Sequence, residues 1–397
     1  MIQNYEPHAQ KTIRVFVIAG EHSGDRLGAD IIKQCENTGQ SIEFHGIGGP
    51  LMARQGLKSI FPLEDIAVMG LTEIIPKLPL IYARLKVTQQ AIKEFSPDIV
   101  LSIDCPDFSL RVQKRLKKED VPGKRVHYVA PTVWAWRPNR AKKIACYLDH
   151  ICCLYPFEPD YFRAHGLDAS FVGHPIARYN FPNLDKQSFV RKYNIPADSK
   201  LIGLYPGSRG AEIKNNVSAL LDAARELKKR DPLYHFIVPG FTRFKERIFK
   251  KADGLREFLT YLEDEETKYG AMPLLDAAIA VNGTVGLELA MAKVPHIICY
   301  KAPWLTYQIA RRLVKIDHIH LINILADHQS LAPEYNNIEI VPEFIQADIK
   351  VMSMVERIEN LMNTKSAWQK QLDAFSQARK KMQSPQKSVS EVLEDVS

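Results

Sequence analysis

The sequence predicts an α/β protein made of two doubly wound domains, each with a parallel sheet covered by helices on both faces. Short, continuous apolar runs, typical of buried parallel strands, alternate with helical patterns along most of the 397 residues. The alternation occurs twice, with a polar stretch at 178–185 between the halves. Two such halves indicate two similar domains that face a cleft.

The first half contains six predicted strands, and several of them end in glycine-rich or acidic turns. The glycines after the first strand, at 20, 24 and 28, lack the GxGxxG spacing of dinucleotide sites, which disfavours a dehydrogenase. We expect Glu21 and Asp25 in that turn to cap a helix at 26–35. The predicted strands, some with their turns, are 12–19, 44–50, 97–104, 125–130, 150–154 and 171–175.

The second half repeats the pattern, with predicted strands at 201–205, 234–238, 258–262, 277–281 and 296–300. The region 349–382 is helical in pattern, and the polar tail after Gln383 is expected to be loose. These features predict an N-terminal domain at 1–178, a C-terminal domain at 179–348, and C-terminal helices with a loose tail at 349–397.

The composition limits which partners and cellular compartments are expected. The net charge of +7 favours an anionic partner, such as a nucleotide, a phosphorylated substrate or an anionic membrane. No run of about 18 apolar residues spans a bilayer, and the polar start of the chain does not resemble a signal peptide. The six cysteines form no CxxC pair and predict core residues in a reducing compartment, the cytoplasm. No cofactor is expected.

The stretch 201–212 predicts an anion site. It has the pattern of a buried strand, a turn containing Gly207, Ser208 and Arg209, and a helix start. Backbone N–H groups at a helix N-terminus favour an anion, and a guanidinium can bind a phosphate through two hydrogen bonds. An ordinary turn with a solvated Arg209 is the alternative.

A second turn of this kind follows the strand 277–281. Gly283 allows close approach of a ligand to the backbone, and Thr284 is expected to be the N-cap. Glu288 could accept hydrogen bonds from ribose hydroxyls, or simply favour the helix dipole. Together the two turns indicate a nucleoside diphosphate lying across the ends of parallel strands.

The predicted strand 97–104 ends in two carboxylates, at the edge where open α/β sheets bind ligands. Asp104 is the favoured general base and Asp107 the reserve, with a strand-end capping role as the alternative for Asp104. We see no DxD motif and no cluster with metal-ligand spacing, so no metal is expected.

An apolar stretch at 66–86 is interrupted by Gly70, Pro76 and Pro79, which makes it poorly suited to a long regular helix. Its basic residues outnumber its acids, a combination that suits contact with an anionic leaflet. We therefore expect exposed apolar side chains here, and the alternative is a buried hairpin or helix pair. The side chains expected to be exposed are Val68, Met69 and Leu71.

From about residue 13 to 346, the sequence resembles the lipid-A-disaccharide synthase family. The resemblance rests on ordered motifs over most of the chain. They are AGEHSGDRLGA at 19–29, GIGGPLM at 46–52, MGLTEI at 69–74, PDIVLSIDCPDFS at 97–109, HYVAPTVWAWRPNR at 127–140, GHP at 173–175, PGSRGAEI at 206–213 and NGTVGLELA at 282–290. His22, Ile322 and the segment 326–340 depart from the family pattern.

The resemblance implies a GT-B-like fold of two Rossmann-like domains, with the nucleotide-sugar mainly on the second. It implies an inverting, metal-independent transfer from UDP-2,3-diacylglucosamine to 2,3-diacylglucosamine 1-phosphate, at the cytoplasmic face of the inner membrane. Val285 and Asn323 join the expected donor contacts. Acceptor-side residues would be Glu21, Ser23, Trp134 and Trp136, although both tryptophans would be core residues in most proteins.

Other readings stay open. A UDP-sugar 2-epimerase or another GT-B transferase would share the phosphate turns of the second half. A non-enzymatic binder of anionic lipid or nucleic acid would also suit the positive charge. Nucleic acid is disfavoured, because the basic residues are scattered among acids and no aromatic platform accompanies them.

Overall fold

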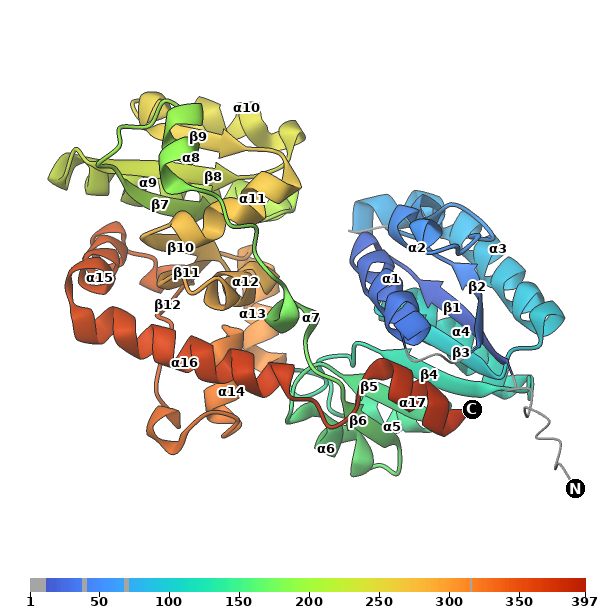
Figure 1. Ribbon diagram of the computed structural model, residues 1–397. Helices are drawn as coiled ribbons and strands as arrows, with labels where there is room; N and C mark the ends of the chain where they lie inside the picture. The colour runs from blue at the N-terminus through green and yellow to red at the C-terminus, as the bar shows by residue number, and fades with distance from the viewer. Residues whose placement is uncertain (1–11, 38–40, 68–70, 315) are drawn as a thin grey trace, which may run out of the picture. The chain divides into compact units, whose positions relative to one another are not determined.

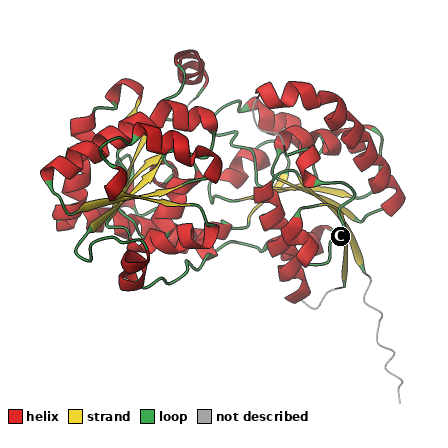
Figure 2. Ribbon diagram, turned by 90° about the horizontal axis from the view of Figure 1, so that it is seen from above, coloured by secondary structure: helices red, strands yellow, loops and turns green. Residues whose placement is uncertain are grey.

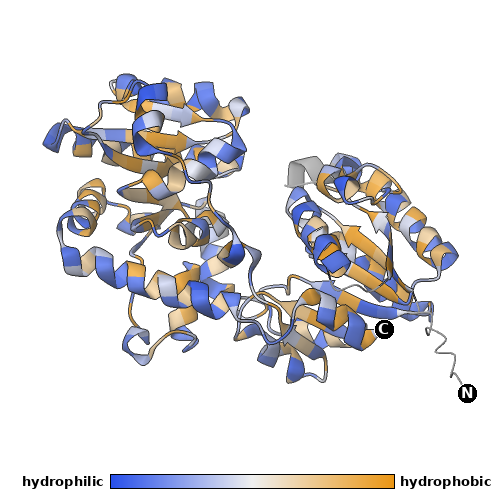
Figure 3. Cartoon of the chain, viewed as in Figure 1, coloured by the Kyte–Doolittle hydropathy of each residue, from blue (hydrophilic) through white to orange (hydrophobic). Residues whose placement is uncertain are grey.

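Two six-stranded sheets, with every strand pair parallel, contain the apolar runs predicted as strands (Figure 1). The computed structural model describes residues 12–37, 41–67, 71–314 and 316–397. It divides the chain into unit 1, Met1–His174 with Ser384–Ser397, and unit 2, Pro175–Gln383. In each unit the strands lie between helices (Figure 2), and they are coloured mainly hydrophobic in Figure 3.

The sheet of unit 1 has the strand order β2-β1-β3-β4-β5-β6. Its cores combine apolar strand residues with one face of each covering helix. The strands are β1 Ile13–Ala19, β2 Ile42–Ile47, β3 Ile99–Ile103, β4 Lys124–Tyr128, β5 His150–Cys153 and β6 Asp168–Phe171. The helices are α1 His22–Asn37, α2 Pro50–Arg54, α3 Leu71–Phe95, α4 Pro106–Lys118, α5 Asn139–Ala145, α6 Glu158–Arg163 and α17 Val389–Val396.

The sheet of unit 2 has the order β12-β11-β10-β7-β8-β9. Its strands are β7 Lys200–Tyr205, β8 Tyr234–Pro239, β9 Leu259–Leu262, β10 Ala277–Val281, β11 His296–Tyr300 and β12 Glu343–Ile345. The sequence pattern did not predict β12. The helices are α7 Pro175–Arg178, α8 Lys186–Lys192, α9 Gly210–Arg230, α10 Thr242–Lys251, α11 Glu265–Ala271, α12 Thr284–Met291, α13 Trp304–Leu313, α14 Leu321–Asp327, α15 Val351–Asn363 and α16 Lys365–Gln383.

The expectation that 66–86 avoids a long helix is wrong, because α3 runs for 25 residues with Pro76 and Pro79 inside it. Each proline removes one helical N–H donor, which costs stability. Both prolines lie in exposed positions near the start of the helix. Leu85 and Ile92, farther along, are buried in the core of unit 1 and hold the helix in place.

The tail after Gln383 is not loose, because it forms α17 on unit 1. Ser388 caps this helix, and its own N–H donates to Glu391 Oε2 at 2.6 Å. Val389, Val392 and Leu393 are buried. Full burial of one such side chain stabilises the folded chain by about 1.5–3 kcal/mol, which offsets the entropy cost of ordering a short polar segment.

Candidate active site

Strand order reverses once in each sheet, between β7 and β10 in unit 2 and between β1 and β3 in unit 1. In open α/β sheets, ligands bind outside the carboxyl ends of strands at such a reversal. Both turns predicted to bind the diphosphate follow the reversal strands of unit 2, and the predicted acids follow those of unit 1. Each group of predicted residues is thus brought together within its own unit.

The turn between β7 and α9 requires glycine at position 207. Gly207 has φ +102°, and a Cβ there would lie 2.6 Å from Glu212 Oε2. That same oxygen accepts hydrogen bonds from the N–H groups of Ser208 at 3.0 Å and Arg209 at 3.2 Å. These two N–H groups were expected to be available to a ligand, so the structure corrects that point: the carboxylate of the chain itself already binds them.

The first two residues of α9 keep the anion-binding character of this turn. Within the described part of the chain, no hydrogen bond takes up the N–H groups of Gly210 and Ala211. The side chain of Arg209 is 64% exposed, with its Nη1 3.7 Å from Glu212 Oε1. An anion at this helix start could therefore meet backbone donors and the guanidinium together.

The turn between β10 and α12 offers open backbone. A Cβ on Gly283 would meet nothing within 4 Å, so a ligand can approach closely there. Gly283, not Thr284, is the N-cap, and Thr284 is the exposed first residue of α12. Val285 and Gly286 complete the first turn. In the next turn, Glu288 Oε1 accepts a hydrogen bond of 3.4 Å from the hydroxyl of Tyr269.

Asn323 does not line either turn. It is fully buried on α14, and its amide group is saturated. Its Nδ2 donates to Val341 O and Glu343 Oε1 at 2.8 and 2.7 Å, while its Oδ1 accepts from the N–H groups of Ile340 and Val341. Asn323 anchors the segment that leads into β12, so the expected nucleotide contact is replaced by a structural role.

The carboxyl ends of β1 and β3 lie against each other in unit 1. A Cβ on Gly20 would lie 2.3 Å from Cys105 Cβ, so only glycine permits this approach. The two loops that carry Glu21 and Asp104 therefore meet at one edge of the sheet. Ser23 and Asp107 are exposed in the first turns of the helices that follow.

Asp104 has an unusual backbone conformation. Asp104 and Cys105 adopt left-handed conformations, with φ of 48° and 45°, and the Asp104 N–H donates to Tyr128 O at 2.9 Å. Aspartate tolerates this region better than most residues. Burial raises the pKa of the Asp104 carboxyl, and a backbone hydrogen bond from Cys105 opposes the rise. A raised pKa makes this carboxylate a stronger base.

Asp25 caps a different helix from the one expected. Helix α1 begins at His22, and the buried carboxylate of Asp25 accepts hydrogen bonds from three N–H groups at the start of α2. The donors are Gly49, Leu51 and Met52, at 2.8, 2.9 and 3.0 Å. Asp25 is thus a structural residue that joins α1 to α2.

The two tryptophans of the loop after β4 differ in exposure. Trp134 is buried, and its Nε1 donates to Glu158 Oε1 at 3.1 Å. Trp136 is 36% exposed, with the Arg137 guanidinium 4.2 Å from its ring centroid. Of the two expected acceptor contacts, Trp136 alone keeps an exposed ring, while Trp134 packs in unit 1.

Glu158 is a residue that the sequence analysis missed. Besides Trp134, it accepts hydrogen bonds from the N–H groups of Leu154 and Tyr155, each at 3.0 Å. Burial raises the pKa of Glu158 to about 7. It joins the loop after β4 to the loop after β5, and the Phe-Glu-Pro sequence gave no signal of that contact.

Other predicted features lie outside the site or outside the described residues. Val68 and Met69 lie outside the described residues, and Leu71 is the first residue of α3. No group of three potential metal ligands occurs in the part of the chain that the structure describes. No described helix is long and apolar enough to cross a membrane.

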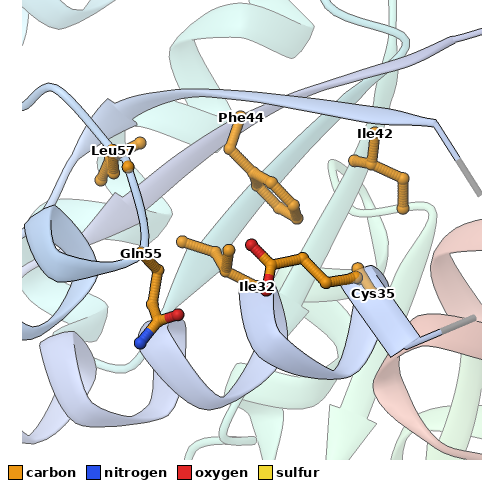
Figure 4. Close-up of a pocket in the computed structure, with 8 residues that line it drawn as sticks. Ile32, Cys35, Ile42, Phe44, Gln55 and Leu57 are labelled. Carbon is orange, nitrogen blue, oxygen red and sulfur yellow. The ribbon is translucent and has the colours of Figure 1, made fainter.

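A cavity of about 170 Å³ in unit 1 has none of the predicted acids in its lining (Figure 4). It is lined by the last turns of α1, the start of β2 and the residues after α2, so it opens near the amino ends of the strands. Burial raises the pKa of the Cys35 thiol in its wall to about 12, which makes that thiol unreactive. The lining residues are Ile32, Cys35, Glu36, Ile42, Phe44, Gln55, Gly56 and Leu57.

Comparison with known proteins decides the family. A family model described as lipid-A-disaccharide synthetase matches residues 15–395. The chain belongs to the lipid-A-disaccharide synthase family. It is 38% identical to the lipid-A-disaccharide synthase of Rhodospirillum centenum, over 92% of this chain and 89% of that protein. It is 35% identical to that of Pseudomonas aeruginosa strain UCBPP-PA14, over 92% and 94%.

Solved structures of low identity share the fold. A UDP-N-acetylglucosamine 2-epimerase described as putative, from Listeria monocytogenes, superposes with a TM-score of 0.63 at 14% identity, over 92% of this chain and 91% of that one. MurG of Acinetobacter baumannii gives 0.52 at 15%, over 97% and 99%. The fold is therefore a GT-B-like pair of Rossmann-like α/β domains, and family membership makes the protein a hexosyltransferase of lipid A disaccharide synthesis.

We expect Arg209→Ala to weaken UDP binding, because the variant loses the exposed cation beside the free N–H groups of α9. A hydrogen bond to a charged group contributes about 1.5–3 kcal/mol. The matched control is Lys229→Ala, which removes an exposed cation from the other end of the same helix. Calorimetric titration with UDP measures both variants, and parental affinity in Arg209→Ala would exclude the assignment.

We expect Asp104→Asn to lower turnover about 10²–10⁴-fold while UDP affinity holds, because the amide cannot take a proton. A general base must be ionised, so the rate should fall as pH drops through the raised pKa of Asp104. This acid limb should lie above the ordinary aspartate range. Near-parental turnover in Asp104→Asn, with a loss in Asp107→Asn, would move the role to Asp107.

Proposed function

We propose that the protein joins UDP-2,3-diacylglucosamine to 2,3-diacylglucosamine 1-phosphate and releases UDP, with inversion at the sugar C1. Family membership supplies the class of reaction. The observation that carries the assignment of roles is the position of both predicted phosphate turns at the strand-order reversal of unit 2. On this proposal unit 2 holds the donor and unit 1 holds the acceptor and the lipid side.

In the proposed mechanism, the acceptor hydroxyl attacks C1 from the face opposite the diphosphate. Asp104 takes the hydroxyl proton as the new C1–O bond forms. The bond from C1 to the phosphate oxygen breaks, and its electron pair leaves with UDP. Glu21 and Ser23 lie at the same edge of unit 1 as Asp104 and are proposed to orient the acceptor.

Charge on the leaving UDP is proposed to be stabilised by the protein itself. Arg209 and the N–H groups of Gly210 and Ala211 face one part of the diphosphate, and the start of α12, at Thr284 and Val285, faces the other. Preorganised donors of this kind stabilise developing charge without a metal ion. Glu288 is proposed to accept from the ribose hydroxyls.

The membrane is the proposed partner of unit 1, at the cytoplasmic face. The acylated substrates reside in a bilayer, and α3 exposes large apolar side chains beside basic ones. Leu78, Leu80 and Tyr82 are 50%, 36% and 51% exposed. Lys86 Nζ lies 5.0 Å from the Tyr82 ring centroid, so the helix combines apolar surface with positive charge.

The product decides the reaction. Purified protein incubated with both diacylated substrates should give a tetraacyl disaccharide phosphate and one equivalent of UDP, measured by mass spectrometry. EDTA should leave the rate unchanged. UDP without a disaccharide would indicate an epimerase-like reaction, the absence of both products would indicate a binding protein, and loss of activity in EDTA would contradict the metal-independent step.

We expect Leu78→Ser to reduce binding to anionic vesicles with little change in Tm, because Leu78 is half exposed. Leu85→Ser is the matched control on the same helix: Leu85 is buried, and the change should cost about 2–5 kcal/mol of stability. Met69→Ser with Leu71→Ser extends the test to the start of the apolar stretch. A large drop in Tm for Leu78→Ser with parental vesicle binding would make this part of α3 ordinary core.

A further inference from the structure

Helix α13 of unit 2 exposes a large aromatic side chain that packing does not explain. Trp304, its first residue, is 72% exposed, more than any other large apolar side chain among the described residues. Leu313, at the other end, is 50% exposed. Tryptophan in such a position favours a boundary where one side is apolar and the other is wet.

The charge around α13 has one sign. Arg311 and Arg312 lie in its last turn and are exposed, as is Lys301 just before the helix. No aspartate or glutamate occurs between 301 and 316, although acids nearly balance bases in the whole chain. Neither arginine forms an ion pair with another described residue, so their charges face solvent.

Among the described residues, no other helix or strand packs extensively against α13, in contrast to α12 and α15 on the same sheet. It follows β11, the strand next to β10, and so begins at the edge that carries the donor turns of unit 2. A basic helix that exposes a tryptophan at this edge is suited to a lipid surface.

We propose that α13 is a second lipid-contacting helix, which places Trp304 at the boundary of an anionic bilayer with Arg311, Arg312 and Lys301 against the lipid headgroups. The partner of α13 is the bilayer surface, because the uniformly positive charge of this segment complements anionic headgroups. The proposal extends the membrane contact of α3 to unit 2 and rests on the proposed function for the kind of surface.

The first test measures the position of Trp304 directly. The full chain is mixed with phosphatidylglycerol vesicles that contain brominated lipid, which quenches nearby tryptophan fluorescence. Quenching should fall sharply in Trp304→Phe, which keeps an aromatic ring for binding, and persist in Trp368→Phe, which removes a half-buried tryptophan of α16. Full quenching in Trp304→Phe overturns the proposal.

The second test measures the charge contribution. Arg311→Gln with Arg312→Gln should lower partitioning onto phosphatidylglycerol vesicles roughly 30-fold at low salt, with little effect on phosphatidylcholine vesicles. The matched control is Lys380→Gln with Lys381→Gln, an exposed basic pair at the end of α16, and should lose much less. Parental partitioning of the arginine variant overturns the proposal.

Two further outcomes would show that α13 binds something other than the bilayer, and each would overturn the proposal. If these α13 variants show a higher KM for the diacylated donor and unchanged vesicle binding, α13 binds the acyl chains of the donor. A changed oligomeric state in analytical sedimentation would make α13 a protein interface. The vesicles contain no sugar nucleotide, so vesicle binding tests this proposal independently of the transferase reaction.

Discussion

The reversal of strand order is the constraint on which the site depends. In a parallel sheet, every strand delivers its carboxyl end to the same edge, and the connections leave that edge on both faces. Where the order reverses, the helices after two neighbouring strands go to opposite faces and leave space between their N-termini. β7 and β10 are these neighbouring strands in unit 2, so the starts of α9 and α12 lie on either side of the reversal.

Two carboxylates of the chain use the same helix-terminus chemistry with different consequences. Asp25 is 2% exposed and satisfies three N–H groups of α2, so it is a permanent cap. Glu212 satisfies two N–H groups next to α9, and its side chain is 20% exposed. A diphosphate carries more charge than one carboxylate and could replace Glu212 at those donors. Glu212 holds this turn in shape, and on the proposed function the donor diphosphate would compete with it for the two N–H groups.

The sequence predicts those strands and turns that are determined by the pattern of neighbouring residues. Continuous apolar runs located ten strands to within about three residues, whereas the predicted strand 171–175 shares only Phe171 with β6. Glycine with small polar residues located the turns at 207–210 and 283–286. The three half-buried residues of β12 give no apolar run, so that strand depends on pairing with β11. The start of α3 contradicts helix propensity, and later residues buried in the core decide its structure. Helix α17 had a cap and an apolar stripe, but its stability depends on unit 1, hundreds of residues away in the sequence.

Buried polar residues account for the errors in the predicted site. Asn323, Trp134 and Glu158 each find partners that are distant in sequence, and no motif spacing encodes those distances. A motif shows that a residue type is needed without showing whether it contacts the substrate or holds the scaffold. Burial with saturated hydrogen bonds separates the two, because a saturated side chain has no donor or acceptor left for a ligand.

A different consequence of burial favours Asp104 over Asp107 as the proposed base. Asp107 is exposed in the first turn of α4. Asp104 precedes that helix in a left-handed turn, partly buried beside the loop of Gly20, and burial raises the pKa of its carboxyl. Less stabilisation of the charged form means greater affinity for a proton, and a base needs that affinity at the moment of transfer. The left-handed turn that holds Asp104 at the sheet edge also keeps its carboxyl partly buried, and that burial raises its pKa.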